Sequence, residues 1–348
     1  MNTALSIPEI DDYGSLLTDE IPIIDVRAPE EFNRGAPPSA VNLPILDDTE
    51  RRDVGIVYQN SGQGAAIAKG WELVSGTNRS DKIHAWKRFA SRHPNAVICC
   101  WRGGLRSQLA QEWLAREEIE LPRVKGGSKA LRQYCLSVLE GSKGRNLVIL
   151  AGRTGSGKTE MIRDLAPSID LEDLANHRGS AFGRMSSPQP TPVGFEFALA
   201  RELLKTSLDQ VVLVEDESTM IGSLKVPDPL YVAMSHAPLV VLAVPLKRRV
   251  ELTYDSYVVG NTHETLVSSL NRIKKRLGGL RFEEVLESLN VAFCSNRRRD
   301  HYRWIEMLLS YYYDPMYDYQ LSKKQNRIEF EGTVDEVCSF LDESFGIN

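Results

Sequence analysis

The glycine-rich string GRTGSGKT, residues 152–159, has the residue types and the spacing of a phosphate-binding loop. It fits GxxxxGK[ST] at every fixed position, follows an apolar run at 146–151 and precedes a helical pattern, which is the context that this motif requires. Glycines let backbone N–H groups wrap phosphate oxygens, and the helix N-terminus adds partial positive charge. The sequence therefore predicts a phosphate-binding set that comprises Gly152, Gly155, Gly157, Lys158 and Thr159.

A second apolar run, VVLVE at 211–215, ends in Glu215, and two more acidic residues, Asp216 and Glu217, follow it. In P-loop proteins a carboxylate after an apolar strand helps to hold Mg²⁺, together with the hydroxyl at the end of the glycine loop. We therefore expect Glu215 and Asp216 to support the phosphate site, and Thr159 with Glu215 to hold Mg²⁺. With three acids in a row, the pattern alone does not decide which one faces the loop.

A cysteine loop, CWRGGLRS at residues 100–107, lies between a predicted buried strand and a helical pattern. Backbone N–H groups at a helix N-terminus, with Arg102 and Arg106 beside them, stabilise a thiolate, which is the nucleophilic form of cysteine. The same ring of donors can hold an oxyanion. Strand alternation turns Cys99 to the opposite face, where we expect it in the core. The predicted catalytic residues are Cys100, Arg102 and Arg106.

Alternating strand and helix patterns must position both loops. Apolar, β-branched runs predict buried strands at 21–27, 96–101, 146–151, 211–215 and 239–244. Strands that alternate with helices favour parallel sheets, and 348 residues suffice for about two domains. We therefore predict an α/β fold with one domain at 10–140, a linker near 141–146, and a P-loop domain at 141–348 that ends in a helical part.

The composition is that of an ordinary globular protein, with 42% hydrophobic and 26% charged residues, which excludes extended disorder. No apolar run approaches the roughly 18 residues of a membrane helix, and the acidic start lacks the basic segment of a secretory signal. Five cysteines form no CxxC pair, so structural zinc is not expected, and their odd number favours a reducing compartment. We expect a cytoplasmic protein with no membrane partner.

A net charge of −5 hides a gradient along the chain. The first fifty residues are acidic, whereas the segments 51–140 and 247–299 carry an excess of lysine and arginine. The second basic segment ends in Arg297, Arg298 and Arg299, followed by Tyr302 and Trp304. Local basic patches with aromatic neighbours can bind nucleic acid, although charge runs are more often solvated surface.

The first half of the chain resembles the rhodanese domain. The resemblance rests on a strand ending in DVR, on PEEFNRGAPPSAVNLP at 29–44, and on a second strand that leads into the cysteine loop. Rhodanese domains carry sulfur or a similar atom on the loop cysteine. Here five residues separate Cys100 from Arg106, one more than in common sulfurtransferases, and this CX5R[ST] spacing also matches the phosphate loop of cysteine phosphatases.

Nearly the whole chain resembles the tRNA 2-selenouridine synthase family. The strings that carry this resemblance are CWRGGLRS, VKGGSKALRQY, AGRTGSGKT, LEDLANHRGSAFG, VEDES and YYDPMYDYQL. It implies a transferase that acts on the wobble uridine in the anticodon of tRNA. The 2-thio group would be geranylated from geranyl diphosphate, and selenium from selenophosphate would then replace the S-geranyl group.

The resemblance also implies roles for particular residues. Cys100 would bear selenium, and the string with His177, Arg178 and Ser180 would contact substrate. The reaction needs no nucleoside triphosphate and no tightly bound cofactor, so we expect the P-loop to serve the diphosphate of geranyl diphosphate. A selenophosphate supplier is a possible partner, and Arg297, Arg298 and Arg299 are candidate tRNA contacts.

Three other interpretations stay open from the sequence. The CX5R spacing fits a cysteine phosphatase with an accessory nucleotide domain, although that interpretation leaves the P-loop without a role. A nucleotide-gated carrier could hand a persulfide to a protein partner. The P-loop could also bind ATP or GTP and gate a conformational change.

Overall fold

The computed structural model describes residues 8–180, 182–183, 185, 187–295 and 297–348. The chain forms two compact units. The first comprises the residues up to Leu139 together with Thr191–Lys205, and the second comprises Glu140–Pro190 with Thr206–Asn348. The division after Leu139 lies beside the expected linker, whereas Thr191–Lys205, which we expected in the P-loop domain, belongs to the first unit.

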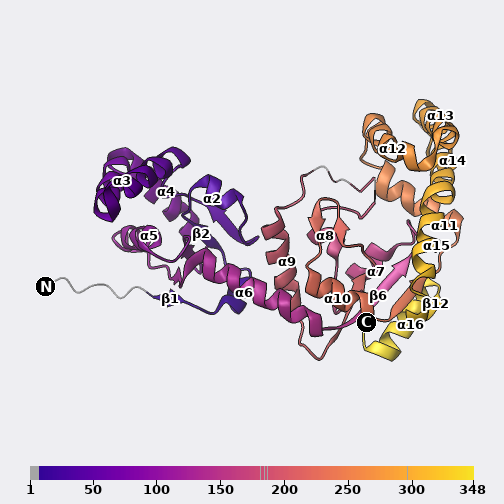
Figure 1. The fold of residues 1–348 in the computed structure, drawn as a ribbon, viewed down its shortest axis with the longest axis horizontal. Helices are drawn as coiled ribbons and strands as arrows, with labels where there is room; N and C mark the ends of the chain where they lie inside the picture. The colour runs from indigo at the N-terminus through magenta and orange to yellow at the C-terminus, as the bar shows by residue number, and fades with distance from the viewer. Residues whose placement is uncertain (1–7, 181, 184, 186, 296) are drawn as a thin grey trace. The chain divides into compact units, whose positions relative to one another are not determined.

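The first unit, which contains β1 and β2 of Figure 1, is built on a parallel five-stranded sheet. The strand order is β1-β5-β4-β2-β3. Its strands are β1 Glu9–Ile10, β2 Ile23–Asp25, β3 Ala40–Asn42, β4 Val97–Cys99 and β5 Arg123–Val124. Its helices are α1 Tyr13–Thr18, α2 Pro29–Asn33, α3 Asp48–Leu73, α4 Gly76–Arg92, α5 Leu105–Ala115, α6 Gly127–Gly141, which runs across the boundary, and α9 Pro192–Leu204. The strands predicted at 21–27 and 96–101 are confirmed as β2 and β4.

The second unit also contains a parallel five-stranded sheet, ordered β12-β11-β6-β8-β7. Its strands are β6 Asn146–Gly152, β7 Ser168–Ile169, β8 Val211–Glu215, β11 Leu239–Leu242 and β12 Ile328–Gly332, with a separate hairpin of β9 Met220–Ile221 and β10 Leu224–Lys225. The three predicted strands are confirmed as β6, β8 and β11. The sequence analysis did not predict β12, because this short run lies within a segment dominated by helix patterns. Its IEFEG sequence does alternate apolar and charged residues, as a half-buried strand does.

Helices make up most of the C-terminal part, as predicted. The helices of the second unit are α7 Lys158–Asp164, α8 Leu171–Leu174, α10 Asp228–His236, α11 Leu246–Thr253, α12 His263–Leu277, α13 Gly279–Ser295, α14 Arg298–Leu308, α15 Asp314–Ser322 and α16 Val334–Phe345. Helices α12, α13 and α14 pack side by side (Figure 1). Phe282, Leu289 and Trp304 belong to their buried core, to which Val250 of α11 also contributes. Within the described residues, no helix is both long enough and apolar enough to cross a membrane.

Candidate active sites: a cysteine loop and a phosphate loop

The cysteine loop joins the end of β4 to the start of α5, so Cys100 lies at the carboxyl edge of the first sheet. Its thiol donates to Ser107 Oγ at 3.2 Å, and the Ser107 hydroxyl donates to the Gly104 carbonyl at 3.0 Å. Cys100 is only 3% exposed, so the sulfur lies inside the loop. The hydroxyl of Ser107, to which we had assigned no role, is therefore the side chain that positions the thiol.

Cys99 has the core position expected from strand alternation. It is buried, and its thiol donates to the Cys100 carbonyl at 3.3 Å. Burial, followed by the nearby charge of Asp25, raises the pKa of the Cys99 thiol well above its ordinary value. Cys99 therefore stays protonated at neutral pH, and the predicted core position is confirmed.

The two loop arginines have different surroundings. Arg106 donates to the Glu31 carboxylate at 2.5 Å, whereas the side chain of Arg102 is exposed. Although burial opposes ionisation of Glu31, the hydrogen bond and charge of Arg106 hold the pKa of this carboxyl below its ordinary value. Glu31 also lies 3.7 Å from Arg51. Glu31, which the sequence did not single out, thus holds two arginines beside the loop.

The VKGGSK string supports the cysteine loop through its backbone. Ser128 N–H donates to the Cys100 carbonyl at 2.8 Å, and Lys129 N–H donates to the Trp101 carbonyl at 3.0 Å. Gly127 has φ +63°, and a Cβ placed there would lie 2.2 Å from the Cys100 carbonyl oxygen. Only glycine allows the start of α6 to approach the loop this closely.

Gly127→Ala is therefore expected to destabilise the first unit by at least about 1–3 kcal/mol, because the substitution combines a left-handed backbone with a steric clash. The matched control is Gly104→Ala in the same loop, where a Cβ meets no atom within 4 Å and φ is −91°. Urea unfolding monitored by circular dichroism measures both variants. Equal stability of the two variants would contradict this role for Gly127.

The phosphate loop has the backbone that its glycines predict. Gly155 and Gly157 have φ +78° and +83°, and Gly157 caps the N-terminus of α7. A Cβ on Gly155 would lie 2.3 Å from Thr253 Oγ1, so α11 packs directly on the loop. The Lys158 ammonium donates to the Gly152 carbonyl at 2.7 Å, which holds its charge across the loop.

Acidic residues from two segments, α8 and the end of β8, meet near Thr159. Its hydroxyl donates to Glu172 Oε2 at 3.3 Å, and the Glu172 N–H donates to Glu215 Oε2 at 3.2 Å. The pKa of Glu217 responds to the same Glu172 carboxyl. Asp216 instead pairs with Lys324 at 2.5 Å. Glu172 therefore links Thr159 to Glu215, and Glu217 belongs to the same acidic cluster, whereas Asp216 is held by an ion pair with a lysine.

Burial and mutual repulsion shift these carboxyls. Burial, with the Glu172 charge second, raises the pKa of Glu217 to about 8 and that of Glu215 well above its ordinary value. Glu215 Oε1 is buried and has no hydrogen-bond partner among the described residues. An oxygen of this kind suits a cation, so Thr159 and Glu215 fit the expected Mg²⁺. The described residues contain no group of three or more His, Cys, Asp or Glu side chains arranged for a metal, so the substrate or water would complete its shell.

The raised pKa of Glu217 predicts a pH-dependent stability. Between the ordinary carboxyl pKa of 4.5 and about 8, the folded chain holds a proton that the unfolded chain has lost, so stability falls as pH rises. Glu217→Gln removes this cost. Without Mg²⁺, its melting temperature is expected to match the wild type near pH 4.5 and to exceed it by several degrees at pH 8.5. Exposed Glu160→Gln is the control, and a pH-independent difference would contradict the assignment.

Gly179 of the HRGSAFG string lies against the same acids. A Cβ on Gly179 would lie 2.5 Å from Glu172 Oε1 and 2.7 Å from Glu217 Oε1. Arg178 places its guanidinium 5.3 Å from the Tyr257 ring centre, and the Ser180 hydroxyl donates to Tyr257 Oη at 3.4 Å. His177 is buried, and its N–H donates to the Glu172 carbonyl. The predicted contact residues His177, Arg178 and Ser180 therefore lie beside the phosphate loop.

Two ion pairs hold α15 against the phosphate loop. Arg153 of the loop pairs with Asp318 at 2.8 Å, and Arg249 of α11 pairs with Asp314 at 2.7 Å. Arg249 also donates to the Thr154 carbonyl at 3.3 Å. The two aspartates of the YYDPMYDYQL string thus connect α15 to the phosphate loop and to α11. Their contacts span more than sixty residues, so the sequence pattern gave no sign of them.

The basic cluster at the start of α14 is partly neutralised. Arg297 pairs with Asp300 at 3.0 Å, and Arg298 pairs with Asp255 at 2.8 Å, whereas the side chain of Arg299 is exposed. Trp304 is only 1% exposed because it packs in the helical core. Trp304 is therefore a core residue and is not available to stack on a base.

Comparisons with known proteins cover both units. Residues 145–346 match the family model described as the tRNA 2-selenouridine synthase AAA domain. The chain is 42% identical to a tRNA 2-selenouridine synthase of Marinobacter nauticus, over 96% of this chain and 98% of that protein. Synthases with the same name from Sulfurovum sp. and Shewanella sediminis are 43% and 44% identical, over 97% and 95% of this chain and 99% and 96% of those proteins. The chain therefore belongs to the tRNA 2-selenouridine synthase family.

Proposed function

We propose that the chain replaces the sulfur of 2-thiouridine in tRNA by selenium, at the wobble position and through an S-geranyl intermediate. The observation that carries this proposal is the similarity over nearly the full length to proteins named tRNA 2-selenouridine synthase. The two loops support it, because one chain holds a cysteine site and a phosphate site. We place the reaction in the cytoplasm, where the tRNA is.

Geranyl transfer would take place at the phosphate loop. The sulfur on C2 attacks the first carbon of geranyl diphosphate, the C–O bond breaks, and the diphosphate leaves with the electron pair while the base loses its N3 proton. The loop N–H groups and Lys158 would hold the diphosphate as its charge grows. Mg²⁺ held by Thr159 and Glu215 would supply further positive charge at the leaving oxygen.

The selenium step would take place at the cysteine loop, whose CX5R spacing suits a tetrahedral anion such as selenophosphate. Selenium attacks C2 of the S-geranyl base, the C2–S bond breaks, and geranyl thiol leaves. Cys100 then takes the phosphoryl group by breaking the P–Se bond, and water releases phosphate from the cysteine. No atom changes its oxidation state, whereas loading selenium onto Cys100 with release of phosphate would need a two-electron oxidant.

The wobble base needs an aromatic surface close to Cys100, since proteins hold splayed RNA bases by stacking. Trp101 directly follows the cysteine and is 43% exposed. Exposed Arg102 lies next to it and would pair with the RNA backbone. We therefore propose Trp101, in place of Trp304, as the residue that stacks on the base, and basic segments of both units as phosphate contacts.

Substitution of Arg297, Arg298 and Arg299 by glutamate is expected to weaken tRNA binding and to reduce its dependence on salt. The slope of the logarithm of the binding constant against the logarithm of the salt concentration should fall by roughly 0.7–0.9 for each lost phosphate contact. Fluorescence anisotropy with labelled tRNA between low and moderate salt measures this slope. Reversal of Lys205 and Lys225, which lie outside the basic clusters, is the control. An unchanged slope in the triple variant would remove this cluster from the tRNA interface.

Mass spectrometry of tRNA nucleosides tests the function. A strain that lacks this gene is expected to contain 2-thiouridine derivatives and no 2-selenouridine, and the cloned gene should restore 2-selenouridine when selenophosphate is available. Purified chain should perform the same conversion with geranyl diphosphate and selenophosphate and no nucleotide. Unchanged selenouridine in the deletion strain would overturn the proposal. Hydrolysis of an aryl phosphate by the purified chain would instead favour the phosphatase. Loss of persulfide from a protein partner in the deletion strain would favour the persulfide carrier.

A further inference from the structure

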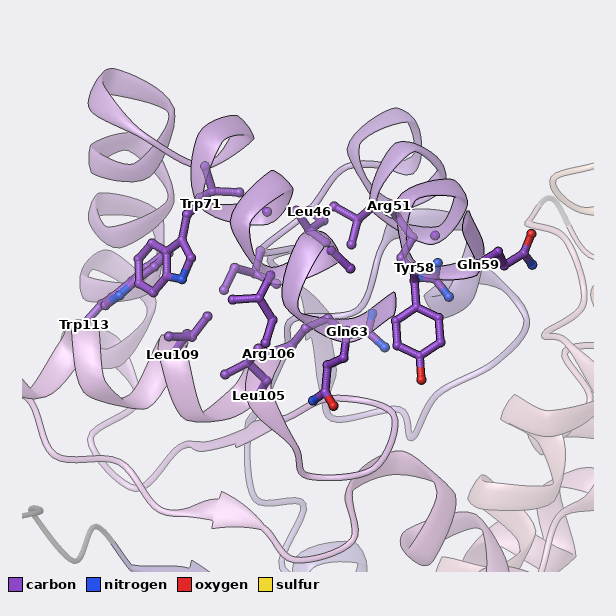
Figure 2. Close-up of a pocket in the computed structure, with 17 residues that line it drawn as sticks. Leu46, Arg51, Tyr58, Gln59, Gln63, Trp71, Leu105, Arg106, Leu109 and Trp113 are labelled. Atoms are coloured by element: carbon purple, nitrogen blue, oxygen red, sulfur yellow. The ribbon is translucent and has the colours of Figure 1, made fainter. Parts of the chain in front are cut away.

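The first unit contains an apolar cavity of about 510 Å³ between α3 and α5 (Figure 2). Small-molecule sites occupy roughly 300–1,000 Å³, so this volume is sufficient for a ligand. Apolar side chains line most of it, among them Val54, Ile67, Trp71, Leu105, Leu109 and Trp113. Nothing in the geranyl-transfer or selenium steps described above uses this cavity.

The cavity follows from the sequence of the two helices. Leu105, Leu109 and Trp113 recur every fourth residue, so they form one face of α5. Opposite them, α3 bends at Gly62, where φ is +80°, so that both of its halves contribute to the wall. Gly70 in the second half has no side chain, and a Cβ there would meet no atom within 4 Å. The missing side chain leaves space that a packed core would fill.

Large apolar side chains remain exposed around this cavity. Tyr58 is 58% exposed, and Trp71 and Leu105 are each 44% exposed. In Figure 2, Trp71 and Trp113 lie together at one end of the cavity, and Tyr58 lies at the other. A cluster of exposed apolar residues around a concave site is typical of a surface that a ligand covers.

The cavity begins at the cysteine loop. Leu105 and Arg106, the first two residues of α5, line it, and the next residue is Ser107, whose hydroxyl lies 3.2 Å from Cys100 Sγ. Arg51 and Arg106 are the basic side chains among the lining residues, and Glu31 pairs with both. A ligand in this cavity would therefore combine an apolar body with a reactive end close to Cys100.

We propose that this cavity binds the geranyl chain of S-geranyl-2-thiouridine during the selenium step. The inference rests on the proposed function, which requires a ten-carbon apolar group on the base that reacts at Cys100. With the chain between α3 and α5, the C2–S bond would lie at the cysteine loop, and geranyl thiol would leave into the apolar wall. The cavity thus makes the geranyl group a handle that selects the activated base over unmodified 2-thiouridine.

The test fills the cavity from Gly70. Gly70→Leu projects a side chain into it, and Gly64→Leu is the matched control, since Gly64 lies on the same helix, does not line the cavity and also has open space at its Cβ. Anticodon stem-loops with S-geranyl or S-methyl 2-thiouridine are given selenophosphate, and selenouridine is measured in single turnovers. Wild type and Gly64→Leu are expected to prefer the geranyl RNA by at least about tenfold, the discrimination that a single methylene can give in an apolar pocket.

Gly70→Leu is expected to lose this preference, so that its rate ratio falls towards one. An unchanged ratio in a folded Gly70→Leu chain, or a wild type that shows no preference, overturns the assignment. Failure of both RNAs to yield selenouridine would overturn the proposed function instead. Geraniol binding provides a measurement without catalysis, because Trp71 and Trp113 line the cavity and report on it by fluorescence. Geraniol should change the emission of wild type and Gly64→Leu, and its failure to do so in wild type also overturns the assignment.

Discussion

Replacing Cys100 with serine is expected to lower the rate of selenouridine formation by more than about 10³-fold, because a serine hydroxyl is not a nucleophile without an activating base. The fold should persist, since serine has nearly the same shape and can still donate to Ser107, as the thiol does at 3.2 Å. Geranylation and tRNA binding should also persist, because neither needs a thiolate. Geranyl-thiouridine is then expected to accumulate in cells that carry this variant.

Cys99→Ser is the matched control, because Cys99 precedes Cys100 directly but is buried with a raised pKa. Nucleoside mass spectrometry of tRNA from cells with either variant gives the answer. A normal amount of selenouridine in cells with Cys100→Ser, together with none in cells with Cys99→Ser, would assign the selenium step to Cys99 instead of Cys100. Quenched reactions with selenophosphate labelled on phosphorus or on selenium show which atom reaches Cys100. Phosphorus is expected, because that route needs no oxidant.

Lys158→Ala is expected to lower the rate of geranylation by roughly 10²–10³-fold, the loss typical when one group that stabilises developing charge is removed. The lysine ammonium lies across the phosphate loop, 2.7 Å from the Gly152 carbonyl, where a diphosphate would draw it away. Selenium exchange into tRNA that is already geranylated should continue at the wild-type rate, because the proposed chemistry of that step uses the cysteine loop.

Both half-reactions are measured with purified chain and without nucleotide. Lys225→Ala is the control for loss of a lysine in the same unit, since Lys225 pairs with Asp228 outside the phosphate loop. Geranylation that strictly requires ATP would mean that the loop binds a nucleotide. Geranylation at full rate in Lys158→Ala would remove the loop from this step. If Lys158→Ala lost selenium exchange to the same extent as geranylation, the two half-reactions would share one site.

The sequence by itself determined the elements that carry chemistry. Short β-branched runs predicted the buried strands. The fixed spacing of GRTGSGKT predicted a phosphate loop at the end of one of these strands. Strand alternation separated Cys99 from Cys100. These features are local, so neighbouring residues along the chain are sufficient to specify them.

Tertiary structure decided which residues meet. The Glu31 carboxylate reaches Arg106 across 75 positions, and Asp314 reaches Arg249 across 65. Glu172 links Glu215 to Thr159, whereas Asp216 is held by Lys324, which is more than a hundred residues away in the sequence. The apolar cavity likewise requires two helices to face each other. Such contacts depend on the packing of distant segments, for which no local periodicity provides a signal.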